Sequence, residues 1–321
     1  MASDAVRVAL IGAGRMGQVH LGALQTSDQI ELAGVVEPFA PIQDQLKASG
    51  IIVHESVDQL LAQEPPEAVL IAAPSDQHPR LVSMFVAAGI PMLCEKPLGV
   101  RVEDTLAAAR AAEESGVLLQ VGYWRRFVPE LRELRDRILA GELGTISQLS
   151  CMQWDGDLPS ESFRAHSGGI TVDMGVHEFD QTRWLLGQEF RWVAASAAGP
   201  NSIERPPSDP DAATILAQLS AGTAATISLG RRFPLADSCW LEVWGTDGYE
   251  RVPFMWDVAG DQVFRSSMRR QAEAFARSVR GAPREGAQAA DAVAAQTVAG
   301  WAADALATRD QARAAPSAVN P

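Results

Sequence analysis

The chain opens with a regular alternation of short apolar runs and amphipathic stretches. Over residues 6–122, runs rich in branched side chains are separated by segments whose apolar positions recur every three or four residues. This alternation is typical of strand–helix units around a parallel sheet and predicts a doubly wound α/β domain. The expected strands are 6–11, 30–36, 68–72, 91–94 and 118–122, with a weaker one at 51–53. The expected helices are 16–27, 41–48, 57–63, 78–88 and 103–115.

The rhythm changes after residue 122, where strand-like runs follow one another with few helices between them. Expected strands are 145–154, 192–198, 212–219, 223–230, 239–245, 249–254 and 261–265, and expected helices are 128–140, 170–186, 267–280 and 287–307. Such a series predicts an α+β domain with a large open, mainly antiparallel sheet. The expected domains are therefore 1–122 and 123–308, followed by a tail at 309–321 rich in Ala, Arg, Pro and Ser that we expect to be disordered.

Composition and charge narrow the class of partner. The 321-residue chain carries a net charge of −13 and no basic stripe, which argues against nucleic acid and anionic membranes. It contains no apolar run long enough to span a membrane, and its first residues lack signal-peptide features, so we expect a cytoplasmic protein. The cysteines Cys94, Cys151 and Cys239 are far apart, which indicates reduced thiols and no zinc or disulfide framework.

A glycine turn follows the first expected strand directly. In Gly12-Ala13-Gly14-Arg15-Met16-Gly17 the first glycine permits a tight turn, the second lets the backbone approach a pyrophosphate, and the third lets helix pack on strand. Alone, such a hexapeptide is compatible with an ordinary glycine-rich turn. Glu37, 20 residues after Gly17 and at the end of the second strand, is the acid expected to accept the ribose hydroxyls of NAD and to repel the 2′-phosphate of NADP.

Lys96 is one of only two lysines in the chain, and the other is Lys47. All the remaining Lys or Arg positions are arginine. Lys96 follows the fifth expected strand, and ligands of open α/β sheets bind beyond the carboxyl ends of the strands. A lysine can change protonation or polarise an oxygen as a compact charge, whereas arginine stays protonated. The alternative is an ordinary surface salt bridge with Glu95.

A second candidate cluster is Asp173 and His177, four residues apart on one face of the expected helix 170–186, with Asp180 three further on. A carboxylate one turn from an imidazole can fix its tautomer and equip it to accept a proton. A capping or surface pair fits the spacing equally well. A metal site is disfavoured, because two ligands on one helix lack a convincing third.

These segments, in this order and spacing, resemble the Gfo/Idh/MocA family of glucose-fructose oxidoreductase and inositol dehydrogenase. The resemblance covers about residues 6–307 and rests on the glycine turn, 73–78, Glu95-Lys96-Pro97, 122–127, 167–177 and 244–248. It implies a Rossmann domain followed by an α+β domain whose open sheet forms homodimers or homotetramers. It also implies NAD as cofactor and an inositol-like cyclic polyol or sugar as substrate.

Site roles follow from the resemblance, position by position. Lys96, Asp173 and His177 match the catalytic lysine, aspartate and histidine, with His177 removing a proton from a secondary alcohol. The expected cofactor contacts are Gly12, Gly14, Arg15, Met16, Gly17, Glu37, Pro74, Ser75, His78 and Glu95. The expected substrate contacts are Lys96, Arg126, Trp154, Asp155, Asp157, Asp173 and His177.

The chain departs from the family pattern in its substrate region. The stretch 233–240 lacks the tyrosine of inositol dehydrogenases, and Trp154 and the acids after it stand where those enzymes place a histidine. A stacking platform and hydroxyl ligands are one interpretation of this segment; a core tryptophan and turn aspartates are the other. Three alternatives remain. The protein is a dehydrogenase of a monosaccharide or biosynthetic keto-sugar, a glycosidase that retains its NAD, or a sensor that binds its ligand without turnover.

Overall fold

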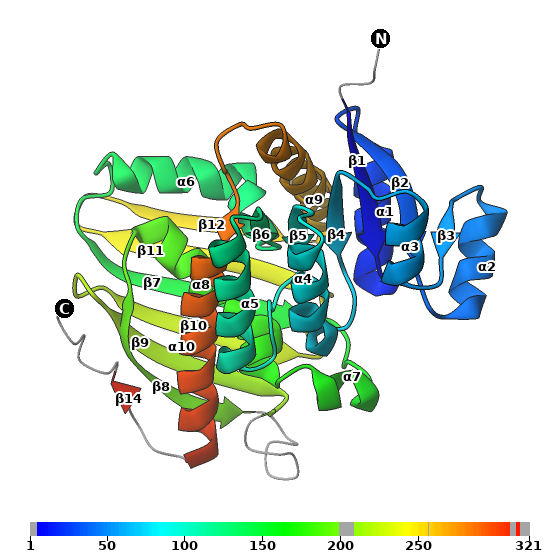
Figure 1. The fold of residues 1–321 in the computed structure, drawn as a ribbon. Helices are drawn as coiled ribbons and strands as arrows, with labels where there is room; N and C mark the ends of the chain where they lie inside the picture. The colour runs from blue at the N-terminus through cyan, green and yellow to red at the C-terminus, as the bar shows by residue number, and fades with distance from the viewer. Residues whose placement is uncertain (1–4, 199–208, 256, 309–312, 315–321) are drawn as a thin grey trace. The chain divides into compact units, whose positions relative to one another are not determined.

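The computed structural model describes residues 5–198, 209–255, 257–308 and 313–314, drawn in colour in Figure 1. The chain forms two compact units. One comprises Met1–Gly99, Glu103–Phe127 and Arg265–Val293, and the other Val100–Val102, Val128–Phe264 and Ala294–Pro321. The unit that holds the N-terminal strands therefore also takes in a segment near the end of the chain.

The first unit is built on a sheet with the strand order β13-β6-β5-β4-β1-β2-β3 among the described residues. Its strands are β1 (Val6–Ile11), β2 (Ile30–Val36), β3 (Val53–His54), β4 (Ala68–Ile71), β5 (Met92–Cys94), β6 (Leu119–Val121) and β13 (Ala287–Gln288). β13 pairs antiparallel with β6, while the pairs from β6 to β3 are parallel. The outward order from β1 in both directions confirms the predicted doubly wound α/β domain.

Helices follow the parallel strands in turn. They are α1 (Arg15–Gln25), α2 (Ala40–Ala48), α3 (Val57–Gln63), α4 (His78–Ala87) and α5 (Val102–Ser115), with the short turns η1 (Ser75–Gln77) and η2 (Trp124–Phe127). Ser56 caps α3, because its side chain accepts a hydrogen bond from the Gln59 amide at 3.2 Å. The sheet is buried on both faces, which explains the near-continuous apolar run of β1. Alternate residues Val8 and Leu10 pack with Leu24 of α1 and Phe275 near the chain end.

The second unit holds a sheet with the strand order β12-β11-β7-β10-β9-β8-β14 among the described residues. Its strands are β7 (Ile146–Asp155), β8 (Phe190–Ala198), β9 (Ala212–Leu219), β10 (Ala224–Arg231), β11 (Ser238–Gly245), β12 (Tyr249–Met255) and β14 (Arg313–Ala314). β7 and β10 run parallel, and the other pairs are antiparallel. The predicted open, mainly antiparallel sheet is confirmed.

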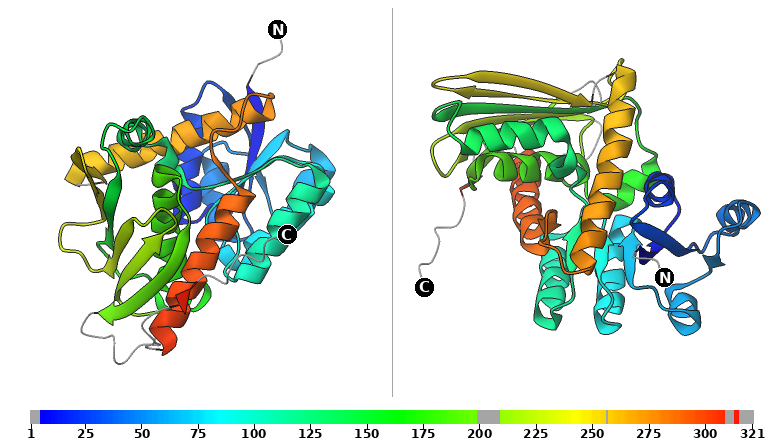
Figure 2. Two further views of the ribbon diagram at one scale, coloured as in Figure 1. Left: turned by 90° about the vertical axis from the view of Figure 1, so that its left-hand side faces the viewer. Right: turned by 90° about the horizontal axis from the view of Figure 1, so that it is seen from above.

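Burial alternates along this sheet, so one face is covered and the other is open. In β9, residues 213, 215, 217 and 219 are buried, whereas 214, 216 and 218 are exposed. The helices of this part of the chain are α6 (Pro129–Leu139), α7 (Glu161–His166), α8 (Val176–Leu186), α9 (Asp257–Val279) and α10 (Ala289–Thr308). Figure 2 shows α6 and α8 lying against the same face of the sheet. The buried side chains of β9 lie on one face of its strand and the exposed ones on the other.

Several expected elements need correction. The strand predicted at 261–265 is wrong, because these residues belong to α9. A helical spacing of three to four links Phe264, Met268, Ala272 and Phe275, of which the last three are buried, and this period outweighs the local strand-like run. Residues 287–288, expected to begin a helix, form β13 by pairing with β6.

Three further segments differ in detail. The helix expected at 170–186 consists of a π-helical turn, η3 (Thr171–Gly175), followed by α8. α7 lies in a stretch that the sequence predicted as loop. Within the expected tail, residues 313–314 pair with β8, and the rest lies outside the described residues. Among the helices described, none is long and apolar enough to cross a membrane.

Candidate active site

The glycine turn at the end of β1 has the geometry that a dinucleotide site requires. Gly12 adopts φ +92°, and a Cβ there would lie 2.9 Å from the Ala72 carbonyl oxygen. Gly17 packs so closely on Gly12 that a Cβ would collide with its carbonyl oxygen. A Cβ on Gly14, the N-cap of α1, would meet nothing within 4 Å. The space that Gly14 leaves open lies at the helix N-terminus, where a phosphate is stabilised by backbone amides and the helix dipole.

Glu37 stands at the end of β2 and is tied to this turn. Its Oε2 accepts the Ala13 amide at 2.9 Å, and its Oε1 accepts the Phe39 amide at 2.9 Å. Gln43 holds the Glu37 backbone carbonyl oxygen at 2.7 Å. The carboxylate is therefore fixed beside the glycine turn, and the remaining lone pairs of its oxygens can accept ribose hydroxyls.

His78 opens α4 and joins two loops at the carboxyl edge of the first sheet. Its Nδ1 lies 2.7 Å from the Pro97 carbonyl oxygen, and its Nε2 lies 2.9 Å from that of Ala73. Burial lowers the pKa of His78 below its ordinary value, although both carbonyl contacts oppose the shift. Pro74 and Ser75 precede it, at the N-cap and first residue of η1. Both ring nitrogens of His78 thus contact backbone carbonyl oxygens of the protein. These two contacts hold the loops 73–75 and 96–97 in place.

Lys96 follows β5, at the same edge of the sheet as the glycine turn and Glu37. Its side chain is half-buried, and its backbone amide donates to Glu95 Oε2 at 3.1 Å. Glu95 is 5% exposed, so its carboxylate is buried rather than on the surface. Its Oε1 lies 2.6 Å from Nε2 of His20, a fully buried residue of α1 that no sequence motif singled out. Burial, followed by the charge of Glu95, raises the pKa of the neighbouring Cys94 thiol well above its ordinary value.

In the second unit, Asp173 lies in the π-helical turn η3, and His177 lies in the first turn of α8. Such π turns are found frequently at functional sites, because they re-aim side chains within a helix. His177 is 7% exposed, whereas Asp173 is half-buried. Most of α8 is buried, which makes it the central helix of its unit.

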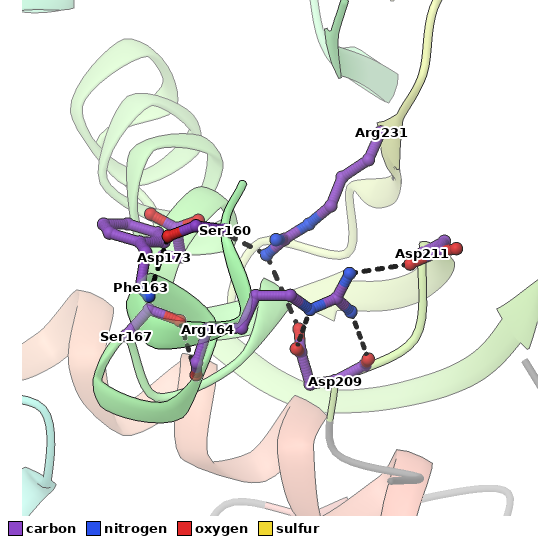
Figure 3. Close-up of polar contacts among 8 residues, drawn as sticks. All are labelled: Ser160, Phe163, Arg164, Ser167, Asp173, Asp209, Asp211 and Arg231. Carbon is purple, nitrogen blue, oxygen red and sulfur yellow. Dashed lines mark hydrogen bonds and ion pairs between the residues drawn. The ribbon is translucent and has the colours of Figure 1, made fainter. Parts of the chain in front are cut away.

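An arginine–aspartate network holds Asp173, as Figure 3 shows. Nη2 of Arg231, at the end of β10, lies 3.3 Å from Asp173 Oδ2 and 3.5 Å from Asp209 Oδ1. Nε of Arg164 donates to Asp209 Oδ2 at 2.6 Å, and its Nη1 donates to Asp211 Oδ1 at 2.8 Å. Arg231 has no exposed side-chain surface. The network fixes the Asp173 carboxylate from the side of the sheet.

The sequence did not predict this network, because its members come from α7, η3, the segment just before β9 and the end of β10. Only the cap on α7 was visible in principle, since Ser160 accepts the Phe163 amide at 3.2 Å and precedes Glu161. Nothing in the spacing of Arg164, Asp209 and Arg231 indicates that they meet.

The expected substrate residues occupy varied settings. Trp154 donates from Nε1 to Ser228 Oγ at 3.0 Å, and its ring lies where a Cβ on Gly230 would be. Asp157 is exposed, and Asp155 accepts the Phe233 amide through its backbone oxygen at 2.8 Å. Arg126, in the first unit, is buried and pairs with Asp291 at 3.1 Å. Their substrate contacts stay predictions.

Comparison with known families decides the identity of this site. The model "Oxidoreductase family, NAD-binding Rossmann fold" of Gfo/Idh/MocA matches residues 6–123, and the Gfo/Idh/MocA C-terminal domain matches 131–250. The chain belongs to the Gfo/Idh/MocA family of oxidoreductases. Its cofactor is NAD, and the open cradle at Gly14 with the anchored carboxylate of Glu37 fits that dinucleotide. Within the described residues, no cluster of His, Cys, Asp and Glu is arranged to hold a metal ion.

Named relatives in the family are similar over long stretches. "Rhizopine catabolism protein MocA" of Rhizobium meliloti is 46% identical over 307 residues, which cover 95% of this chain and 96% of the relative. "Inositol 2-dehydrogenase" of Rhizobium meliloti strain 1021 is 31% identical over 76% of this chain and 74% of the relative. The crystal structure of a putative myo-inositol dehydrogenase from Sinorhizobium meliloti 1021 superposes with a TM-score of 0.86 at 28% identity. That superposition covers 96% of this chain and 99% of the other.

Proposed function

We propose that this protein is an NAD-dependent dehydrogenase that oxidises a secondary alcohol of a cyclic polyol to a ketone. The observation that carries the proposal is the arrangement of one sheet edge. The glycine turn after β1, Glu37 after β2 and Lys96 after β5 all lie at the carboxyl ends of parallel strands of one sheet, in which β4 separates β1 from β5. This edge is where open α/β sheets bind their ligands. The inositol dehydrogenases among the relatives support a polyol as substrate.

Each protein residue has a defined task in this reaction. The amides around Gly14 hold the pyrophosphate, and Glu37 accepts the ribose hydroxyls. Lys96 holds the alcohol oxygen as a positive charge, and His177 accepts its proton. Asp173, fixed by Arg231 at 3.3 Å, orients His177 and stabilises it once protonated. Bound NAD supplies the acceptor for the hydride.

The test is a substrate panel with both cofactors. The purified protein is mixed with NAD or NADP and with inositol isomers, aldoses or glycosides, and the absorbance of the reduced cofactor is followed. We expect turnover with NAD and at least one inositol. Tight NAD binding without turnover of any polyol would favour a sensor or an enzyme that retains its cofactor, and turnover of aldoses alone would move the substrate class to monosaccharides.

Cofactor preference tests the assignment of Glu37 separately. We expect Glu37→Ala to weaken NAD at least about 10-fold, since a hydrogen bond to a charged group contributes roughly 1.5–3 kcal/mol. Discrimination against NADP should relax in the same variant, because the repelling carboxylate is gone. An unchanged preference would contradict the assignment.

We also propose that the open face of the second sheet forms a homodimer or homotetramer. Leu216 on this face is 45% exposed, and Trp240 and Trp244 on β11 point to the same side and are half-buried. A face that exposes large apolar side chains is typical of a protein–protein interface. Light scattering should show an oligomer for the wild type and a smaller species for Leu216→Glu. A monomeric wild type would refute this assembly.

A further inference from the structure

A fully buried histidine–carboxylate pair lies beneath the proposed catalytic lysine. His20 is 0% exposed and Glu95 is 5% exposed, and Nε2 of His20 lies 2.6 Å from Oε1 of Glu95. His20 belongs to α1, the helix that begins at the glycine turn, and Glu95 immediately precedes Lys96. The pair therefore connects the helix of the cofactor cradle to the loop that carries the lysine.

The hydrogen bonding of His20 defines which atom donates. Its Nδ1 is buried and, within the described residues, makes no hydrogen bond. A proton on that nitrogen would leave a buried donor unsatisfied, which costs about 1–3 kcal/mol. The proton therefore belongs on Nε2, which donates to the Glu95 carboxylate. His20 acts as a donor to a buried acid.

The second oxygen of Glu95 faces the catalytic loop. Oε2 accepts the backbone amide of Lys96 at 3.1 Å, and the Glu95 amide donates to the Ile71 carbonyl oxygen at 2.8 Å. Gly122 leaves the room that the carboxylate occupies, because a Cβ there would lie 2.9 Å from Glu95 Cδ. The carboxylate is thus held from both sides, and through its second oxygen it holds the main chain of Lys96.

Stability alone does not explain such a pair. Buried ionic and polar pairs contribute no more to stability than well-packed apolar residues of similar volume, and often less. What this pair does provide is a fixed position for the residue after Glu95. Both Glu95 oxygens accept hydrogen bonds within the protein, and the expected contact of Glu95 with the cofactor stays a prediction.

We propose that His20 is a positioning residue for Lys96 and acts through the Glu95 carboxylate. The proposal rests on the proposed catalytic role of Lys96. The Lys96 ammonium must meet the alcohol oxygen within hydrogen-bond distance, and small misplacements of a catalytic group are costly. Through Glu95, His20 restricts the movement of the Lys96 backbone and thereby the position of the Lys96 side chain.

The first experiment separates rate from cofactor binding. We expect His20→Leu to lower kcat about 100-fold, the loss that a displacement near 1 Å produces. NAD affinity, measured by calorimetry without substrate, should stay within about 2-fold because Gly14 and Glu37 are untouched. His20→Gln retains a donor at the position of Nε2 and should recover much of the lost rate.

A second readout does not depend on activity. The chain has two lysines, so the modification of Lys96 by a small acylating reagent can be measured by mass spectrometry against exposed Lys47 as internal standard. His20→Leu should change the Lys96:Lys47 ratio in the cofactor-free protein, while the Lys47 rate stays constant. His20→Gln should bring the ratio back toward the wild-type value.

The control is His54→Leu, the same change at another buried histidine of this unit. It should lower the melting temperature without altering kcat or the labelling ratio. Wild-type kcat and labelling ratio in His20→Leu would overturn the proposal. If His20→Leu does not fold, Glu95→Gln takes its place, because its amide cannot accept both donors; normal kcat there would equally overturn it. Full activity of Lys96→Ala would instead refute the catalytic role on which the proposal rests.

Discussion

The two units differ in the segments that carry their candidate residues: the ends of parallel strands in the first unit, and the helical segments η3 and α8 in the second. In the first unit, each candidate directly follows a parallel strand, so a short motif places the glycine turn, Glu37 and Lys96 at one sheet edge. In the second unit, Asp173 takes its partner from a strand 58 residues away. Local motifs thus reveal the residues proposed to face a ligand, whereas the residues that hold them in place come from distant segments.

The largest effect should come from the lysine of the first unit. We expect Lys96→Ala to lower kcat roughly 10²- to 10⁴-fold, the range for loss of a positioned charge or proton-transfer group. NAD affinity should remain close to that of the wild type. Lys47→Ala is the matched control, since Lys47 is exposed on α2. Near-normal turnover of Lys96→Ala would show that Lys96 is not a catalytic residue.

The Arg231 network tests the second unit. Arg231→Leu removes one partner of a buried charge network, and we expect it to lower the free energy of unfolding by about 3 kcal/mol and kcat by roughly 10-fold or more. Arg251→Ala breaks an exposed pair with Glu242 and should cost less than about 1 kcal/mol. Chemical denaturation and initial rates measure both quantities. Equal losses of stability and of kcat in the two variants would show that the buried network contributes no more than the surface pair.

Two glycines of one motif should separate folding from binding. Gly17→Ala collides with the Gly12 carbonyl oxygen and should destabilise the fold by about 1–3 kcal/mol. Gly14→Ala meets no protein atom within 4 Å and should cost less than about 1 kcal/mol. The same Gly14 variant should weaken NAD at least about 10-fold, because its methyl group fills the pyrophosphate cradle and a lost charged hydrogen bond costs roughly 1.5–3 kcal/mol. Denaturation measures the loss of stability, and calorimetry measures the loss of NAD affinity. A large loss of stability in Gly14→Ala, or unchanged NAD affinity in that variant, would contradict the prediction.

The smallest effect is a dependence of stability on pH. Burial lowers the pKa of His78 in the folded state, whereas the unfolded chain has a value near 6.5. The unfolded state therefore takes up a proton first, so the contribution of His78 to stability is present above pH about 6.5 and is lost as the pH falls through the folded value. Denaturation between pH 8 and pH 5 should show a shallower decline for His78→Gln than for the wild type. Identical slopes would mean that His78 does not titrate in this range.

The sequence predicted most of the fold because its elements carry strong periodic signals. The helix at 57–63 with its Ser56 cap and the longer strands of both sheets follow from local patterns. It failed at 261–265, where a short apolar run was taken for a strand although the longer helical period belongs to α9. It also could not show β13, since a two-residue strand exists only through its partner β6.

For the site, the sequence by itself determined which residues could face the cofactor and the substrate. A glycine with φ +92°, an acid after the second strand and a lysine after the fifth are each specified by a few neighbouring residues. Only the tertiary structure decided what holds them, such as His20 under Glu95 and Arg231 beside Asp173. The physical reason is that a buried polar group needs a partner, and the chain supplies that partner from whichever segment the packing brings near.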